Sequence, residues 1–420
     1  MPAPPVASTV LSFEDARRTV EDHAARILAP VIETVDLLDA AGRALAEPVL
    51  ADRDLPPFPR STRDGYAVRS TDLTNLPVTL KVIAEIKAGE KPELIPSSFG
   101  PGQTASIMTG APVPSGADAV VMVEYTTRDG NRVEITRNVT PGENIVPRGA
   151  EAAHGIALLS PGVRLNEVAV ALAASVGKPQ LEVYRRPRVA VLATGDEIVE
   201  VKATPGPTQI RNSNSYSLAV QIRRAGGQPV LLPIAPDEPQ GLQRLIEKGL
   251  ESDLLLMTGG VSMGRYDLVE QVLSEMGAEF FFTGAKIQPG RPVVFGCCGA
   301  GAPARETSTT YFFGLPGNPI STMVTFELFA RPILAALAGQ SPEKLGFLHA
   351  RLKREIRIKT GLKRFLPAIL SGEFENSEVE LVAWQGSGDI AATARANCYA
   401  VIPADREAIE AGEWLAVLPR

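Results

Sequence analysis

Two glycine-rich segments carry the residue types that bind a phosphate group. Residues 193–197 follow the strand-like run RVAVLA, and residues 258–264 follow the run DLLLM. Consecutive glycines let backbone N–H groups approach an anion, and threonine or serine hydroxyls donate to phosphate oxygens. Ligands of open α/β sheets bind beyond the carboxyl ends of strands, where both segments are expected. A phosphate-bearing ligand is one interpretation, and glycines that only permit tight turns explain the spacing about equally well.

Two carboxylates accompany these segments. Glu197 closes the first, and Asp267 follows the second by three residues. Together they could hold Mg²⁺, which needs only one or two protein carboxylates in addition to phosphate and water. Taken singly, each is better explained as part of a helix N-terminus, where acidic residues are favoured. The three histidines are widely spaced and no CxxC or HExxH pattern occurs, so any metal is expected to have oxygen ligands.

Two later clusters offer candidate anion ligands. Residues 286–292 (KIQPGRP) contain Lys286 and Arg291, and residues 313–319 (FGLPGNP) place Asn318 where it can cap the apolar helix that follows. For Lys286, ordinary surface charge is a live alternative.

Other motifs provide less evidence about function. The segments TRDGYA at 62–67 and MTGA at 108–111 suggest no chemistry by spacing alone. The P-loop pattern GxxxxGK[ST] is absent, which argues against a P-loop kinase or ATPase. Residues 386–391 match GxGxxA, but 29 residues after Ala391 are too few for a dinucleotide-binding domain, so a turn is predicted there.

Four regions of the chain, which differ in their pattern of apolar and turn residues, must position these residues. Helical spacing predicts a helix over residues 12–29, with Ser12 as N-cap and Pro30 as its stop. Strand-like and helix-like runs alternate after Arg188 and end in an apolar helix at 320–337, which predicts a mostly parallel sheet with helices on both faces. The predicted fold is thus multi-domain α/β plus β, with an N-terminal helical linker domain (1–51 with 150–184), a small β-rich domain (52–149), a central α/β domain (185–340), and a C-terminal β domain (341–420). In the C-terminal domain five short strands are predicted, at the runs IRIKT, FLPAIL, VELVAW, CYAVIP and EWLAVL.

Composition excludes several classes of protein. The 42 basic and 48 acidic residues give a net charge of −6, so no global basic field exists to hold nucleic acid. The N-terminus lacks the features of a secretory signal, and no apolar run reaches the length of a membrane span, the best being VAVALAA at 168–174. The expected location is the cytoplasm, with no contact with nucleic acid or membrane.

Eight segments together resemble the molybdopterin molybdenumtransferase family, which includes the MoeA proteins and the E domain of gephyrin. They occur in family order and span nearly the whole chain. The matching segments are RDGYA (63–67), MTGAPVP (108–114), ATGDEI (193–198), RNSN (211–214), TGGVSMGRYD (258–267), PGRP (289–292), GLPGNP (314–319) and GSGDIAATARAN (386–397).

The resemblance implies an enzyme that takes adenylylated molybdopterin and molybdate, cleaves the adenylate with Mg²⁺, and releases AMP and molybdenum cofactor. It also implies a central molybdopterin-binding fold, a barrel-like C-terminal domain, and a homodimer whose site lies between the α/β domain of one subunit and the small β domain of the other. A molybdopterin adenylyltransferase and molybdoenzyme apoproteins are possible partners.

The resemblance also assigns site residues. Those implied in catalysis are Asp64, Thr109, Glu197, Asp237 and Asp267, with Glu197 and Asp267 as metal ligands. Those implied in binding substrate are Thr194, Gly195, Asp196, Asn214, Thr258, Gly259, Gly260, Ser262, Gly264, Lys286, Pro289, Arg291, Pro316, Gly317 and Asn318. Lys286, Arg291 and Arg63 are the candidates for binding molybdate, a small oxyanion that needs cationic or amide donors.

Two departures from the family pattern bear on activity. The Gly-Glu-Asp that usually follows Pro-Arg-Gly is replaced by residues 150–152 (Ala-Glu-Ala), so the aspartate is missing. Many members have lysine where this chain has Gln288, and the lost charge predicts weaker binding of an anion, with Lys286 as a possible substitute.

Two other functions remain open. An adenylyltransferase of the same superfold would leave both β domains unexplained, and ATP turnover with metal-free molybdopterin would reveal it. A non-catalytic dimeric scaffold would not need the motif carboxylates Asp64, Glu197, Asp237 and Asp267.

Overall fold

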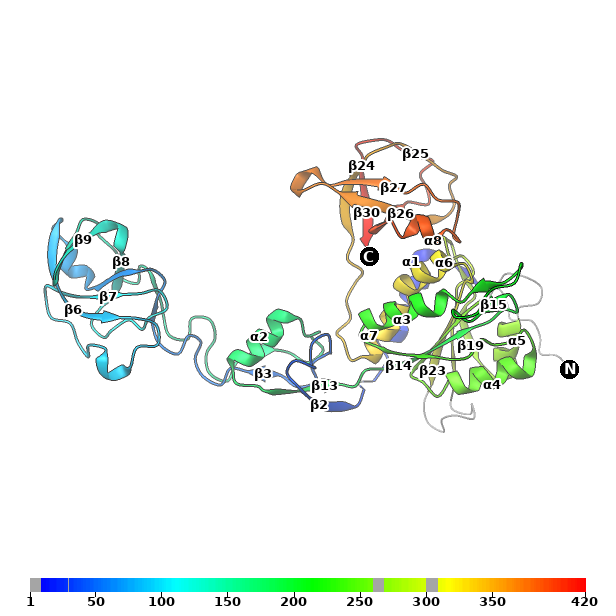
Figure 1. The fold of residues 1–420 in the computed structure, drawn as a ribbon, viewed down its shortest axis with the longest axis horizontal. Coiled ribbons are helices and arrows are strands. Elements are labelled where there is room, and N and C mark those ends of the chain that lie inside the picture. Colours follow the sequence, from blue (N-terminus) through cyan, green and yellow to red (C-terminus); the bar gives the residue numbers. More distant parts are fainter. Residues whose placement is uncertain (1–8, 29, 260–267, 300–308) are drawn as a thin grey trace.

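The computed structural model describes residues 9–28, 30–259, 268–299 and 309–420. Figure 1 shows an elongated chain, with a β-rich unit at one end, a smaller unit carrying α2 next to it, and the α/β domain with a β unit above it at the other end. The predicted multi-domain α/β plus β fold class is confirmed.

A six-stranded sheet forms the centre of the α/β domain. Its order is β17-β14-β18-β23-β22-β19, and only β22 runs against the other strands. The central strands β14 and β18 are apolar and almost wholly buried, because helices cover both faces of the sheet. The strands span Arg188–Ala193 (β14), Gln228–Leu231 (β17), Leu254–Thr258 (β18), Glu279–Phe282 (β19), Val294–Cys298 (β22) and Thr310–Leu315 (β23).

Alternate residues of these strands face two separate helical layers. Val189 and Val191 pack with α1, α3, α6 and α7, whereas Ala190 and Leu192 pack with α4 and α5. The helices are α1 (Phe13–Ala24), α3 (Asn214–Arg224), α4 (Pro239–Gly249), α5 (Leu268–Glu275), α6 (Pro319–Thr325) and α7 (Arg331–Leu337), with a π-helical segment η4 (Phe326–Ala330) between the last two. A small ladder pairs β15 (Ile198–Val199) with β16 (Ile210–Arg211) beside α3.

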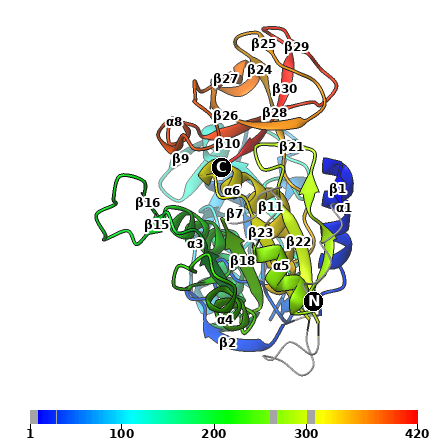
Figure 2. The ribbon, with the colours of Figure 1, turned by 90° about the vertical axis from the view of Figure 1, so that its right-hand side faces the viewer.

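The N-terminal helix belongs to this domain rather than to the linker domain that the sequence predicted. Ala16 and Val20 of α1 are fully buried in the α/β core, and β1 (Val10–Leu11) pairs with β20 (Gly284–Ala285). Figure 2 shows α1 on the same side of the domain as β21 and β22. Ser12 caps α1 as predicted by accepting from the Asp15 N–H at 3.0 Å, but the helix ends at Ala24 rather than at residue 29.

The continuous helix Pro319–Leu337 is long and apolar enough to cross a membrane by length and average composition, although Glu327 and Arg331 interrupt it and no unbroken apolar run reaches that length. A core helix meets the same criteria, and 61% of its most apolar window is buried. Phe326, Phe329 and Ile333 are fully buried in the α/β core. The apolar composition of this helix is therefore accounted for by its packing.

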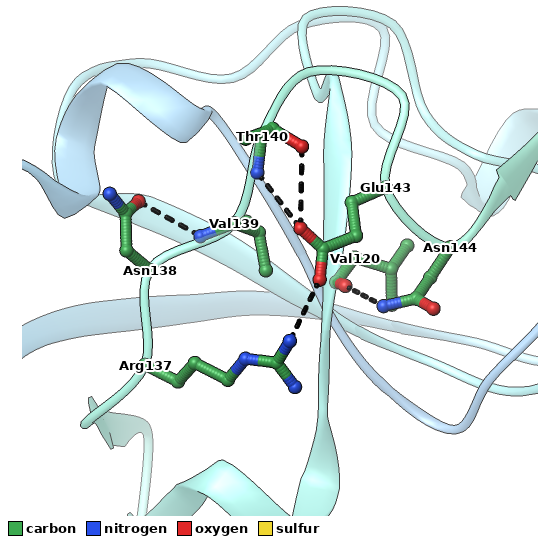
Figure 3. A network of polar contacts seen from close by, with 7 residues as sticks. All are labelled: Val120, Arg137, Asn138, Val139, Thr140, Glu143 and Asn144. Carbon is green, nitrogen blue, oxygen red and sulfur yellow. Dashed lines mark hydrogen bonds and ion pairs between the residues drawn. The ribbon is translucent and has the colours of Figure 1, made fainter.

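The small β-rich domain is a six-stranded sheet in the order β8-β5-β7-β6-β10-β9, with a core on each face. Figure 3 shows the polar network of the loop that leads back toward the linker: Glu143 accepts from Arg137 and Thr140, while Asn144 donates to the Val120 carbonyl. The strands are β5 (Gly65–Val68), β6 (Val78–Ile86), β7 (Gln103–Ile107), β8 (Ala119–Met122), β9 (Thr126–Asp129) and β10 (Arg132–Ile135), and the pair β4 (Arg60–Ser61) and β11 (Ile145–Val146) joins the domain to its neighbour.

The linker domain lies between these two units (Figure 1). Its core is built from two antiparallel pairs and one helix, with Leu45, Leu165 and Val183 buried at its centre. The elements are β2 (Ile32–Asp36), β3 (Val49–Leu50), β12 (Ala157–Leu159), α2 (Glu167–Ser175) and β13 (Gln180–Tyr184).

The C-terminal domain is a closed five-stranded barrel, because β28 pairs with both β30 and β26. The run IRIKT, predicted as one of five strands, instead forms β25 (Ile356–Arg357), which pairs with β29 (Ala408–Ile409) outside the barrel. The α/β domain adds a short strand, β21 (Ile287–Gln288), to the edge of this sheet. The barrel strands are β24 (Leu348–Leu352), β26 (Lys363–Ser371), β27 (Glu378–Leu381), β28 (Cys398–Ile402) and β30 (Trp414–Pro419), with α8 (Ile390–Thr393) before β28.

Candidate active-site cleft

A cleft of about 710 Å³ opens at the carboxyl ends of β14, β18 and β23. This is the position at which open α/β sheets bind ligands. Eight of the residues predicted from the sequence line it: Thr194, Glu197, Asn214, Thr258, Gly259, Pro316, Gly317 and Asn318. Gly388 and Ile390 of the C-terminal domain line its far side.

Hydrogen bonds tie the loops of the cleft to one another. The Asn214 side-chain amide donates to Thr258 Oγ1 at 2.8 Å and to the Gly317 carbonyl at 2.7 Å. The Thr194 N–H donates to the Thr258 carbonyl at 3.0 Å. Asn214 Oδ1 and Thr194 Oγ1 are buried and have no partner among the described residues. Buried polar atoms are nearly always satisfied, so these two are suited to contact a ligand or water.

Gly259 lets two strand ends approach closely. Its φ is +91°, and a Cβ at this position would lie 2.3 Å from the Thr194 carbonyl oxygen. A side chain is therefore excluded both by backbone conformation and by space. The Cα of Gly259 also lies 3.4 Å from the position that a Cβ of Gly317 would take, so the loops that follow β18 and β23 meet here.

Of three carboxylates near the end of β14, Glu197 lines the cleft, whereas Asp196 and Asp237 are not among the described lining residues. Glu197 is exposed, and its carboxylate lies over Gly195, where a Cβ would be 2.5 Å from Oε2. Asp196 and Asp237 face each other: the Asp237 N–H donates to Asp196 Oδ1 at 3.2 Å, and the Asp196 N–H donates to Asp237 Oδ2 at 3.4 Å. The structure thus brings Asp237 to the end of β14, more than forty residues away in sequence.

Asp64 and Thr109 lie together in the small β-rich domain, at the other end of the chain from the cleft (Figure 1). The N–H and hydroxyl of Thr109 both donate to Asp64 Oδ1, at 2.7 and 2.8 Å. These hydrogen bonds stabilise the carboxylate and hold the pKa of Asp64 below its usual value. Gly65 follows in β5, where a Cβ would lie 1.9 Å from the Val121 carbonyl oxygen, so only glycine fits beside Asp64.

The residues of the KIQPGRP segment lie in different surroundings and do not form one site. Lys286 is exposed and lines a different hollow, beside α1 and the barrel. Pro289 is buried, and Arg291 is exposed and precedes Pro292, which lines the cleft. Asn318 stands at the N-cap of α6, but its side chain makes no capping hydrogen bond, so that part of the sequence prediction was wrong.

Three family models together match most of the chain. The model "MoeA N-terminal region (domain I and II)" matches residues 11–177, "Probable molybdopterin binding domain" matches 190–336, and "MoeA C-terminal region (domain IV)" matches 349–419. A protein of Nostoc sp. named molybdopterin molybdenumtransferase is 36% identical, covering 92% of this chain and 88% of the relative. The chain belongs to the molybdopterin molybdenumtransferase family.

Other members of this family are similar over nearly the whole chain. The Bacillus subtilis molybdopterin molybdenumtransferase is 32% identical, covering 92% of this chain and 89% of the relative. A crystal structure of a MoeA protein from Pyrococcus horikoshii is 27% identical, with a TM-score of 0.77 over 98% of this chain and 100% of that one. The family predicted from the sequence motifs is confirmed.

Some cleft residues were missed by the sequence reasoning. Arg211 is exposed at the cleft and is the one basic side chain among the described lining residues; its Nε donates to the Ala203 carbonyl at 3.1 Å. Asn212 and Ser213 also line the cleft. The family segment RNSN contains all three, but only its last residue, Asn214, was selected, because spacing gave no reason to choose among them.

The two departures from the family pattern have structural partners. Glu151 forms an ion pair with Arg60 at 2.8 Å, next to the strand that leads to Asp64. Gln288 accepts a hydrogen bond from Arg364 at 2.7 Å. The predicted site residues Gly260, Ser262, Gly264 and Asp267 lie outside the described residues.

Proposed function

We propose that this chain takes adenylylated molybdopterin and molybdate, cleaves the adenylate, and transfers molybdenum to the dithiolene, with release of AMP and molybdenum cofactor. The observation that carries this proposal is the cleft at the strand ends, where the family segments around Thr194, Asn214, Thr258 and Gly317 meet. Relatives named molybdopterin molybdenumtransferase cover most of the chain, which supports the same activity.

The side chains of the cleft suit the splitting of a phosphoanhydride. This reaction needs charge neutralisation and positioning more than it needs a covalent nucleophile. Arg211 supplies a positive charge, and Thr194 Oγ1 and Asn214 Oδ1 are unpaired polar atoms that can orient the substrate. The pKa of the buried thiols Cys297 and Cys298 is raised to about 11, which keeps them protonated and makes them poor nucleophiles.

A divalent cation fits the donor set of this cleft. Glu197 presents an exposed carboxylate, and Mg²⁺ takes one or two protein carboxylates and completes its shell with phosphate and water. Across the described residues no group of three acidic, histidine or cysteine side chains is gathered for a metal. We propose Glu197, which lines the cleft, and Asp267, which the family pattern implies, as the Mg²⁺ ligands. The bound ion would neutralise phosphate charge.

We further propose that the working unit is a homodimer. Asp64 and Thr109 lie at the far end of the chain from the cleft, so their participation requires the small β-rich domain of a second copy (Figure 1). The product molybdenum cofactor would pass to molybdoenzyme apoproteins, and a molybdopterin adenylyltransferase would supply the substrate.

The test is AMP release from adenylylated molybdopterin by the purified protein, with and without Mg²⁺ and molybdate. Release that requires both supports the proposal. Turnover of ATP with metal-free molybdopterin would instead indicate an adenylyltransferase. Nucleotide binding without either reaction would indicate a scaffold.

A further inference from the structure

Two isoleucines of the ribbon formed by β15 and β16 line the cleft. Ile198 and Ile210 are paired in register, so their side chains are neighbours on one face of the ribbon. Ile210 is 58% exposed. Its N–H donates to the Glu197 carbonyl at 2.8 Å, which ties the ribbon to the loop after β14. The ribbon therefore presents a fixed apolar surface to the cleft.

A third isoleucine lines the same cleft from the C-terminal domain. Ile390, the first residue of α8, is 42% exposed, and Figure 2 shows α8 above the ribbon. Asp389 caps α8 by accepting from the Ala392 N–H at 2.9 Å, and the Ile320 N–H of α6 donates to the Ser387 carbonyl at 3.0 Å. Hydrogen bonds within its own domain and across to the α/β domain thus fix the position of Ile390.

The polar and apolar parts of the cleft lining come from different elements. Thr194, Thr258 and Gly259, which carry hydroxyl and amide groups, stand at the ends of β14 and β18. The isoleucines stand on the ribbon and on α8. Binding sites for small molecules combine these two kinds of lining: apolar side chains contact the body of the ligand, and a few polar groups fix its orientation.

The isoleucines limit the chemistry of the ligand group that they can bind. An isoleucine side chain neither donates nor accepts hydrogen bonds, so it offers nothing to a phosphate or a sugar hydroxyl. An exposed isoleucine is stabilised when an apolar surface removes it from water. In a substrate made of phosphate, sugar-like and heterocyclic parts, the largest apolar surface is the flat face of the heterocycle. Adenine and pterin share this chemistry, because each is a fused nitrogen heterocycle.

We propose that Ile210 and Ile390 hold the fused nitrogen heterocycle of the substrate between the ribbon and the C-terminal domain, and so select for ligands that carry this ring. The assignment rests on the proposed function, which supplies two such rings, the adenine of the adenylate and the pterin of molybdopterin. Because one isoleucine belongs to the α/β domain and the other to the C-terminal domain, the bound ring bridges the two domains.

The experiment is calorimetric titration of the full-length protein with AMP, with ribose 5-phosphate and with 6-hydroxymethylpterin. Ribose 5-phosphate keeps the sugar and phosphate of AMP but lacks the ring. Ile210→Ala and Ile390→Ala each leave only a methyl group, and each is expected to weaken binding of a ring-bearing ligand roughly tenfold. Ribose 5-phosphate should bind both variants as it binds the wild type. Weaker binding of AMP identifies the ring as adenine, and weaker binding of the pterin identifies it as pterin.

Two matched controls remove exposed aliphatic side chains from the same elements of the fold. Ile369 of β26 and Val201 of the ribbon are each 41% exposed, and neither is among the described residues that line the cleft. Ile369→Ala and Val201→Ala should therefore bind all three ligands like the wild type.

Three results would overturn the proposal. The first is that either Ile210→Ala or Ile390→Ala binds both ring-bearing ligands like the wild type. The second is that ribose 5-phosphate loses as much affinity as AMP, since the loss then comes from a disturbed cleft. The third is that the wild type binds AMP no more tightly than ribose 5-phosphate and does not bind the pterin. The titrations need no turnover, so isoleucine-dependent ring binding without AMP release would reject the proposed function alone.

Discussion

Gly259→Ala is expected to force apart the loops after β14 and β18. A Cβ at this position lies 2.3 Å from the Thr194 carbonyl oxygen, and contacts below 3.0 Å essentially do not occur, so the carbonyl must retreat by at least 3.0 − 2.3 = 0.7 Å. The left-handed backbone costs an alanine about 1–2 kcal/mol. Forcing a side chain into packed space adds about 1–3 kcal/mol. The expected local destabilisation is therefore about 2–5 kcal/mol.

Gly277→Ala provides the matched control. Gly277 also has a positive φ, +76°, but nothing lies within 4 Å of the position that its Cβ would take. This variant therefore carries the cost of the backbone conformation without the close approach, and it lies in the turn between α5 and β19. The difference between the two variants isolates the contact with Thr194.

Two measurements, hydrogen exchange and AMP release, distinguish the two variants. Hydrogen exchange at the Thr194 amide, which donates to the Thr258 carbonyl, should become faster in Gly259→Ala and stay unchanged in Gly277→Ala. AMP release should fall by about 10²-fold in the first variant only, because a displacement approaching 1 Å in a catalytic site has an effect of that order. Equal exchange and equal activity in the two variants would refute the reasoning about the close approach.

Three further predictions concern charged and thiol groups. Asp64→Asn should reduce AMP release while leaving the cleft intact. In the wild type the hydrogen bonds from Thr109 lower the pKa of Asp64, so the stability they contribute is present at neutral pH and is lost as pH falls through that lowered pKa. A Thr109 amide NMR signal that titrates at the ordinary aspartate pKa would contradict this. Glu197→Gln should raise the Mg²⁺ concentration needed for half-maximal AMP release, whereas Glu200→Gln, an exposed neighbour outside the cleft, should not; identical Mg²⁺ curves would remove Glu197 from the metal site. The pKa of each cysteine thiol is raised to about 11, so Ellman's reagent at pH 8 should label the native protein slowly and the denatured chain rapidly at all three cysteines, and rapid native labelling would show that the thiols are accessible.

The α/β domain could be predicted from the sequence because its signals are local. Strands such as RVAVLA and LLLMT are buried on both faces and so appear as continuous apolar runs, and the glycine-rich segments stand directly after them. That order along the chain was enough to place Thr194 and Thr258 at one edge of the sheet. Their family segments also identified Asn214 and Gly317, whose hydrogen bonds complete the cleft.

Other features depend on contacts between distant segments. Helical spacing predicts α1 but not its partner, and its apolar face packs on η4 and α7 about 300 residues away. Similarly, the hydrogen bond between Gln288 and Arg364 joins residues that lie 76 positions apart on two domains. From the sequence alone, Gln288 could be interpreted only as the loss of the positive charge that many family members have there. Asp64 and Thr109 are 45 positions apart, and only the pairing of β5 with β7 brings their segments together.

The strand that β21 adds to the barrel limits how the chain can be divided. A boundary drawn at residue 341 leaves Ile287 and Gln288 with the α/β domain, although they pair with Lys363 and Arg364. A barrel excised there would carry an unpaired edge at the start of β26, which invites association with other chains. A barrel transplanted from a relative would meet the wrong partner at Gln288. The exchangeable module is therefore residues 341–420 together with the discontinuous loop 286–292, and chimaeras should carry both pieces from the same parent.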